Sequence, residues 1–505
     1  MFPCASSNLR MTRPQRLPGI WERALEALID IFSFILFKVL DRIDRILCII
    51  FQLLDWAFDG GRYPCYCHLS RDARHQHLEQ GVSKELHADT HLEADSLWNG
   101  VSDSLHNRDH IKSEHLFSHI NFENAASCHD ITPLRPLLKG QPKSSDMKET
   151  IIFILNHFFI FLKMKARNIT SIKQDEDYPS KAKARWSDCG CKSCTDLQLS
   201  TSRMLYVVQS GRGTGSGFAM ENDILFLHGF LSSSSFWVDR VFPYLSESIQ
   251  KSYRLFAVDL LGFGKSPKPS KCLYTLADHV ETIRKSILEP YGIKCIHLVG
   301  HSMGCTVALA LAAEFPKLVK SVTLISPPYF AATSAEMSGL HVLRQVAPKK
   351  IWPLISFGSS VMSWYEHIGR VVCFVICKNH QLWEPPLQLL ARIVRIPRCF
   401  VQDFMQHTHH SAWHVFHNTI CGAAYNIDRY LKILADFGCE VTIIHGREDY
   451  LCPVNCSYQL QAKYPKVQLN IIENAGHHAV VADCKYAIAK QLEGIWTRNL
   501  QPLNA

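Results

Sequence analysis

The sequence predicts an α/β protein in which a mostly parallel sheet is covered by helices on both faces. From about residue 200, within a predicted domain at 199–501, short apolar runs alternate with stretches of helical character. That alternation is expected when parallel strands are joined by crossover helices. The first three runs, at 223–227, 255–259 and 295–299, each end in a turn that contains glycine. With 505 residues, 47% of them hydrophobic, the chain can bury a large core.

The chain ahead of this domain begins with a basic tail at residues 1–20 and a predicted amphipathic helix at 21–60. At ~100° per residue, charged residues such as Asp30, Asp41 and Asp44 fall mostly in one arc of the helix. They also interrupt any apolar run long enough to cross a bilayer. We expect the helix to lie in the plane of a membrane or to act as an uncleaved signal anchor. The alternative is a helix docked on the chain's own domain.

Residues 61–198 are predicted to be a loosely ordered linker, because His, Ser, Asp and Glu are frequent and apolar runs are scarce. A short apolar helix is expected at 151–162, which is too short to cross a membrane. The triplets beginning at Asn168 and Asn455 allow glycosylation if the chain enters the secretory route.

Two groups of cysteines lie in the linker, Cys65 with Cys67, and Cys189 with Cys191 and Cys194. Their spacing is not that of a standard zinc finger or knuckle, so we expect neither a metal nor a cofactor. Disulfides that staple the front helix to the following domain are the favoured interpretation. Acylation of a cysteine near the membrane, or no special role, is the remaining alternative.

The third strand leads into Gly-His-Ser-Met-Gly at 300–304, a G-x-S-x-G motif followed by a helix-forming run at 305–315. Glycines are needed there because the serine sits on a strained turn where larger neighbours would collide with strand and helix. The motif in this context predicts Ser302 as a nucleophile and the α/β-hydrolase fold. Backbone N–H groups of Met303 and Phe230 are placed to form the oxyanion hole.

A serine hydroxyl is a weak nucleophile at neutral pH, so a base must take its proton and an acid must orient that base. In this fold the three groups follow in the order Ser, Asp, His. Asp449 follows a predicted strand and is the candidate acid, and His477 in the last loop is the candidate base. The neighbouring His478 remains an alternative base. The three residues predict an acyl-enzyme mechanism at Ser302.

A helical, aromatic insertion at about 328–436 is predicted to form a cap over the active site. An apolar cap suits an acyl chain, because each buried methylene contributes ~0.8 kcal/mol to binding. Five histidines in the cap are expected to be packed or solvated rather than metal ligands; they are His407, His409, His410, His414 and His417. The formal net charge is +8, but its Lys and Arg are scattered, so nucleic acid is not an expected partner.

Several stretches resemble the plant BODYGUARD family of α/β-hydrolases. They include His-Gly-Phe-Leu-Ser-Ser-Ser-Ser-Phe-Trp at 228–237, Ser-Trp-Tyr-Glu-His-Ile-Gly-Arg at 363–370 and Lys-Asn-His-Gln-Leu at 378–382. The resemblance implies a lysophospholipase or related lipid esterase of the cell surface or wall that acts in cuticle assembly. It also implies a secreted or membrane-associated chain, with the triad on Ser302, Asp449 and His477.

Two other functions remain open. The spacing from His478 to Asp483 matches an H-x4-D pattern of some acyltransferase relatives, so the acyl group could pass to an alcohol, as in cutin-polyester formation. A non-catalytic receptor or scaffold on the same fold is the third possibility. Labelling by a fluorophosphonate separates an active serine from a scaffold.

Overall fold

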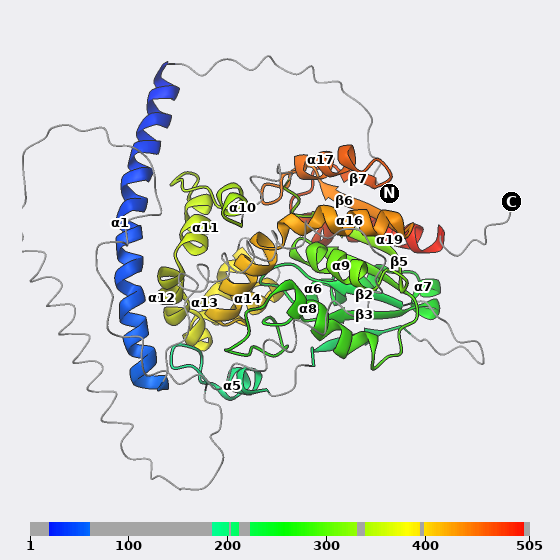
Figure 1. The fold of residues 1–505 in the computed structure, drawn as a ribbon, viewed down its shortest axis with the longest axis horizontal. Helices are drawn as coiled ribbons and strands as arrows, with labels where there is room; N and C mark the ends of the chain where they lie inside the picture. The colour runs from blue at the N-terminus through cyan, green and yellow to red at the C-terminus, as the bar shows by residue number, and fades with distance from the viewer. Residues whose placement is uncertain are drawn as a thin grey trace, which may run out of the picture. The chain divides into compact units, whose positions relative to one another are not determined.

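A seven-stranded sheet lies at the centre of the computed structural model (Figure 1). The structure describes residues 20–60, 184–200, 204–211, 223–330, 339–393 and 398–498. The strand order is β1-β3-β2-β4-β5-β6-β7. β1 runs antiparallel to β3, and every other neighbouring pair is parallel. The strands are β1 (Val207–Ser210), β2 (Asp223–Leu227), β3 (Arg254–Val258), β4 (Ile296–His301), β5 (Val319–Ile325), β6 (Glu440–Gly446) and β7 (Gln468–Ile472).

Alternate residues of the buried strands enter two separate cores, one on each face of the sheet. In β2, Leu225 and Leu227 pack on one side, whereas Ile224 and Phe226 pack on the other. All five residues of β2 are buried, as expected for a strand covered on both faces. The expected α/β-hydrolase architecture is therefore confirmed.

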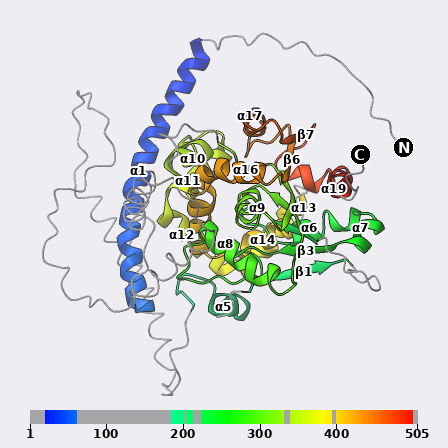
Figure 2. The same cartoon turned by 45° about the vertical axis from the view of Figure 1, so that its right-hand side comes forward.

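Helices cover both faces of this sheet. On one face α9 (Met303–Glu314) lies between α8 (Leu276–Ile283) and α16 (Ile427–Asp436), as Figure 2 shows with α9 nearly end-on. On the other face lie α6 (Ser235–Val238), η2 (Phe242–Tyr244), α7 (Glu247–Ser252), α18 (Ala479–Ala482) and α19 (Lys485–Arg498). Smaller elements are η3 (Arg284–Leu288), α17 (Asn455–Lys463) and, ahead of the sheet, α5 (Lys192–Leu199).

A helical cap is inserted between β5 and β6, as the sequence predicts. Its elements are α10 (Gly339–Val346), α11 (Leu354–Trp364), α12 (Glu366–Val375), η4 (Cys377–Asn379), α13 (His380–Ile393), α14 (Arg398–Met405), α15 (His409–His414), η5 (Val415–Cys421) and η6 (Ala424–Asn426). α16 lies within the interval predicted for the cap, but its Leu431 and Leu434 pack in the core with α9. It therefore belongs to the layer that covers the sheet.

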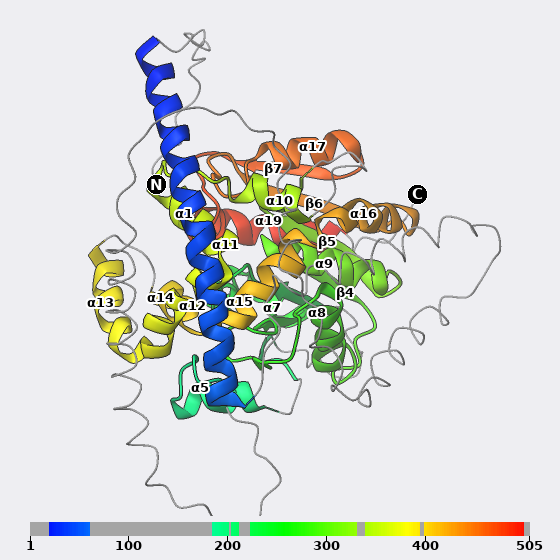
Figure 3. The ribbon, with the colours of Figure 1, turned by 60° about the vertical axis from the view of Figure 1, so that its left-hand side comes forward.

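The front helix α1 (Ile20–Asp59) lies alongside α11 and α12 of the cap (Figures 1 and 3). Asp41, Asp44 and Asp55 face the cap, whereas Glu26 and Asp30, nearer the start of the helix, are exposed. Asp44 accepts hydrogen bonds from two backbone N–H groups in the first turn of α12, those of His367 and Ile368, both at 2.9 Å. Asp55 accepts two hydrogen bonds from Arg370, at 2.5 and 2.8 Å. One face of the helix is thus docked on the domain, the alternative that the sequence left open.

The opposite face of α1 is apolar and exposed. Phe34, Ile49 and Trp56 are 62–64% exposed, and the same face carries Leu25, Leu28, Ile31, Ile35, Ile46 and Leu53. Asp41, Asp44 and Asp55 thus face the protein, while the apolar side chains face outward together with the exposed Lys38, Arg42 and Arg45. None of the helices in the described part of the chain has a stretch that is long and apolar enough to cross a membrane.

Several expectations fall outside the described residues. They concern the basic tail, the apolar block at 151–162, Cys65, Cys67 and the triplet at Asn168. Asn455, in the other triplet, is exposed in the first turn of α17.

Candidate active site

Ser302 stands at the turn between β4 and α9 in a strained conformation, with φ 52° and ψ −120°. Its backbone N–H donates to the carbonyl of Ile325 in β5 at 2.9 Å. A Cβ added to Gly300 would lie 2.5 Å from the carbonyl oxygen of Gly304, and one added to Gly304 would collide with the carbonyl of Leu227. The glycines of the motif are therefore required by close backbone packing, as the sequence predicts.

Asp449 lies in the loop after β6, and its buried carboxylate accepts hydrogen bonds from four groups. Oδ1 accepts from the backbone N–H groups of Leu451 at 2.9 Å and Cys452 at 2.8 Å. Oδ2 lies 2.7 Å from Nδ1 of His477 and 3.2 Å from Nε2 of His445. Burial would raise the pKa of Asp449, but the hydrogen bonds from His445 and His477 outweigh it and hold that pKa well below its usual range. The carboxylate is therefore ionised.

His477 reaches Asp449 from the loop after β7, so two of the three predicted residues meet directly. The Nδ1–H of His477 donates to the carboxylate, which leaves Nε2 as the nitrogen able to accept a proton. The neighbouring ring of His478 instead packs edge-on against Phe400, with ring centroids 5.3 Å apart. Burial, helped by the nearby His477, lowers the pKa of His478 to about 4. Of the two histidines, His477 is the one that hydrogen-bonds to the carboxylate of Asp449.

His301, which directly precedes Ser302, connects the serine turn to the loop that carries His477. Its Nε2 donates to the carbonyl oxygen of His477 at 2.9 Å, and the two rings have centroids 4.9 Å apart. Burial first, and then the charges of His477 and His478, hold the pKa of His301 well below its usual range, so the ring is neutral. The serine turn and the histidine loop are thereby fixed to one another.

The loop after β2 approaches Ser302 from the other side. A Cβ added to Gly229 would lie 3.3 Å from Cβ of Ser302, so the next residue, Phe230, is close to the serine. His228 fixes the loop, because its Nδ1 donates to the carbonyl of Gly229 at 2.7 Å and its Nε2 accepts from the N–H of Leu260 at 2.8 Å. Met303 is the first residue of α9, and this end of a helix carries a partial positive charge.

The sequence interpretation missed three further groups at this site. His445 is anchored by Ser457 and the carbonyl of Cys452, at 2.6 and 2.8 Å, and it supports Asp449 from behind. Asp403 of α14 accepts from Ser233 Oγ at 2.7 Å, and burial raises the pKa of this carboxyl to about 6. The thiol of Cys452 lies beside the hydroxyl of Ser302, and burial keeps its pKa well above the usual value. Only His445, inside a strand-end motif, carried a local signal.

Two groups of side chains have the composition of metal sites. Cys189, Cys191 and Cys194 converge with His380, and Cys373 and Cys377 converge with His407. The three cysteines of the first group are free thiols, so the favoured disulfide interpretation is wrong for them. Both groups contribute to the lining of one cavity of about 400 Å³. The other cap histidines are packed as expected, and burial lowers the pKa values of His409, His410, His414 and His417.

Residues 223–352 match the alpha/beta hydrolase fold family. A protein of Arabidopsis thaliana named "Probable lysophospholipase BODYGUARD 3" is 36% identical over 489 residues, which cover 92% of this chain and 95% of that protein. "Probable lysophospholipase BODYGUARD 1" of the same organism is 34% identical over 490 residues, covering 95% and 98%. The solved structure of a thermophilic esterase from Thermogutta terrifontis is 18% identical, with a TM-score of 0.39, and the match covers 58% of this chain and 93% of that one.

The fold and the family match define the class of this protein as an α/β hydrolase, in agreement with the sheet and the serine turn. The chain belongs to the BODYGUARD family, which confirms the resemblance noted in the sequence. It is a carboxylic ester hydrolase.

Proposed function

We propose that this protein is a serine esterase that cleaves lipid-like carboxylic esters through Ser302, His477 and Asp449. The observation that carries the proposal is the 2.7 Å hydrogen bond from His477 Nδ1 to Asp449 Oδ2, made beside a serine held on a strained turn. Residues 302, 449 and 477 follow three different strands of the parallel sheet. The carboxyl ends of such strands meet at one edge, where enzymes of α/β folds bind their ligands.

In the proposed mechanism, Ser302 Oγ attacks the acyl carbon while Nε2 of His477 accepts the hydroxyl proton. Asp449 stays ionised, keeps the Nδ1–H tautomer and stabilises the imidazolium. Backbone N–H groups of Met303 and Phe230 donate to the developing oxyanion. His477 then returns the proton to the leaving alcohol, and water, activated by the same histidine, releases the acyl group from Ser302.

The proposed substrates are esters with an acyl chain, with lysophospholipids as the first class to test. The names of the BODYGUARD relatives support this choice. The cap supports it as well, because it presents exposed apolar side chains, among them Leu354, Ile355 and Ile393 at 71–82% exposure. Exposed apolar patches on a soluble domain commonly mark an interaction with another apolar surface.

The test is labelling with a fluorophosphonate, followed by turnover of lysophospholipids, acylglycerols and hydroxy-fatty esters. We expect the wild type and the control Ser359→Ala, an exposed serine of α11, to be labelled and active. Ser302→Ala should be neither. Equal amounts of product from wild type and Ser302→Ala would contradict the proposal of a serine esterase.

An alcohol acceptor added to the same reactions tests acyl transfer. If ester formed on that alcohol in preference to free acid, acyl transfer would replace hydrolysis as the function.

We further propose that α1 attaches the enzyme to a lipid surface in the plane of the interface. The support is its long exposed apolar face, which carries the exposed basic residues Lys38, Arg42 and Arg45, while Asp41, Asp44 and Asp55 are turned toward the cap. We expect the double variant Phe34→Glu with Ile49→Glu to lose binding to phospholipid vesicles but to hydrolyse a short soluble ester normally. Glu26→Gln, an exposed polar position on the same helix, should bind as wild type does. Unchanged binding of the double variant would contradict this proposal.

A location at the cell surface or cell wall, with a role in cuticle lipid assembly, is also proposed, on the basis of the family resemblance. The exposed Asn455 would then be open to glycosylation. The test is fractionation of the tagged full chain with and without endoglycosidase treatment. We expect a wall or membrane fraction and a glycan-dependent shift in mobility. A chain recovered without glycan from the cytosol would contradict the proposal.

A further inference from the structure

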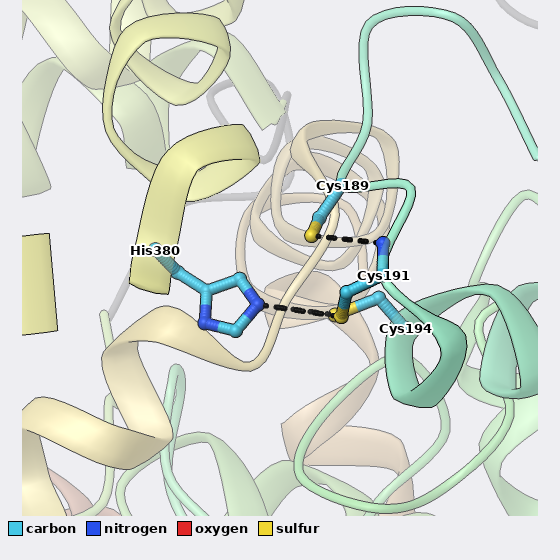
Figure 4. A group of neighbouring side chains, drawn as sticks. All are labelled: Cys189, Cys191, Cys194 and His380. Carbon is cyan, nitrogen blue, oxygen red and sulfur yellow. Dashed lines mark hydrogen bonds between the residues drawn. The ribbon is translucent and has the colours of Figure 1, made fainter. Parts of the chain in front are cut away.

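Three cysteines ahead of the sheet meet one histidine of the cap. Cys189, Cys191 and Cys194 come from the segment that leads into α5, and His380 is the first residue of α13 (Figure 4). Their sulfur atoms and a ring nitrogen all lie within 4.8 Å of one another. His380 Nε2 is 3.6 Å from Sγ of Cys191 and 3.7 Å from Sγ of Cys194. Four ligand atoms therefore surround a single point.

These separations match those of ligands around one tetrahedral zinc ion. Zinc binds sulfur at about 2.3 Å and imidazole nitrogen at about 2.0–2.1 Å, which places the two ligand atoms about 3.6 Å apart at the tetrahedral angle. A disulfide instead requires sulfur atoms about 2.05 Å apart. The three thiols here are free. The geometry thus favours a shared ion over a bond between two of the cysteines.

The surroundings of the four ligands are also those of a metal site. The other ring nitrogen of His380, Nδ1, lies 2.9 Å from Oε1 of Glu384 one turn further along α13. A histidine that ligates a metal almost always donates its second N–H to a carboxylate or carbonyl, which fixes the tautomer that offers a lone pair to the ion. Sγ of Cys189 accepts the backbone N–H of Cys191 at 3.5 Å, as a metal-bound thiolate does.

We propose that Cys189, Cys191, Cys194 and His380 bind one structural zinc ion, which ties the segment ahead of the sheet to the cap. Four protein ligands close the coordination sphere, so the site leaves no open position for a catalytic water. Soft thiolates and one imidazole select zinc over magnesium or calcium. The sequence alone disfavoured this site because its fourth ligand lies 186 residues after Cys194.

The group of Cys373, Cys377 and His407 is the natural competitor in any measurement of metal content. Its sulfur atoms lie 3.7 and 3.8 Å from Nε2 of His407, and Nδ1 of that ring donates to the carbonyl of Phe404 at 2.6 Å. Among the described residues this group offers three ligand atoms, one fewer than a closed zinc site needs. Variants of His407 therefore distinguish the two sites.

The test is the metal content of the full chain, purified without chelator and measured by inductively coupled plasma mass spectrometry. We expect about one zinc per chain in the wild type, and a loss of at least ~90% in His380→Ala and Cys194→Ser. His380→Cys should restore the metal, because it replaces one zinc ligand by another. The matched controls, Cys439→Ser and His341→Ala, should keep it. Substitution by cobalt should produce thiolate charge-transfer bands that are absent in Cys194→Ser.

Fluorophosphonate labelling of each variant reports whether the hydrolase domain is folded, independently of its metal. A wild type that binds no zinc or cobalt would overturn the proposal. Zinc that is retained in His380→Ala but lost in His407→Ala would also overturn it. A third contradicting result is a disulfide among the three cysteines, found by peptide mapping of the chain purified under reducing conditions.

Discussion

Two regions of the molecule are built in different ways. One is the edge of the sheet that carries Ser302, and the other is the junction of α1 with the cap. At the sheet edge, each functional residue follows its own strand, and the parallel pairing brings the strand ends together. At the junction, side chains from distant parts of the sequence meet. Asp55 of α1 accepts from Arg370 of α12 and, at 2.7 Å, from Nε1 of Trp186 in the segment before α5. The first region is organised by the backbone, the second by buried charges.

This difference predicts different responses to substitution. A change at the sheet edge should remove activity and leave the fold intact, because the backbone holds the site. A change at the junction should lower stability, because a buried charge that loses its partner cannot be solvated. The following variants test that contrast.

Asp449→Asn should produce the largest effect, a fall in kcat/KM on a soluble ester of roughly 10⁴-fold, because the amide no longer selects the Nδ1–H tautomer of His477. The fold should remain intact, but the unfolding midpoint should fall, because the ionised carboxylate whose pKa is lowered in the folded state stabilises that state at neutral pH. His478→Ala, the neighbouring histidine that does not bond to Asp449, is the control and should lose less than ~10-fold. The opposite ranking would assign the base to His478.

Asp55→Ala should destabilise the chain by about 3–5 kcal/mol, because the buried Arg370 loses its carboxylate partner. Denaturant unfolding measures this difference. Asp30→Ala changes an exposed acid on the same helix and should stay within about 0.5 kcal/mol of wild type. If the two variants were equally stable, the buried ion pair would not organise the junction.

Gly229→Ala should lower kcat by about 10–100-fold, because the new Cβ would sit 3.0 Å from Nδ1 of His301 and 3.3 Å from Cβ of Ser302. Initial-rate measurements with a soluble ester determine this change in kcat. Gly494→Ala adds a methyl group where nothing lies within 4 Å, and its activity should match wild type. Full activity in Gly229→Ala would show that the loop after β2 does not need this close approach.

Asp403 of α14 joins the cap to the segment after β2 through Ser233 and Ser235, and its effect should depend on pH. Its folded pKa of about 6 lies above the unfolded value of about 3.9, so the folded state holds the proton more tightly. Stability contributed by this group is therefore full below about pH 4 and is lost as the pH rises to about 6. Asp403→Asn removes the titration, so relative to wild type it should gain about 1–2 kcal/mol between these pH values. Parallel unfolding curves across that range would contradict this.

The same contrast explains what could be predicted from the sequence. β2 was predicted with its observed bounds. Ser302, Asp449 and His477 could be proposed as site residues because each belongs to a local motif at a strand end. The antiparallel edge strand β1 was missed because its four residues carry too little pattern. The orientation of α1 was left open because Asp44 and Asp55 look like solvent-facing charges until their partners on α12 are known. The pairing of His380 with the cysteines likewise has no signal in local spacing.

The central claim is that Ser302 forms the covalent intermediate, and mapping the acyl group tests it most directly. A slowly hydrolysed long-chain ester is mixed with the full chain, quenched with acid, digested and analysed by mass spectrometry. We predict that the acyl mass lies on Ser302. An acyl group found on the adjacent thiol of Cys452, or no covalent adduct during turnover, would contradict the account.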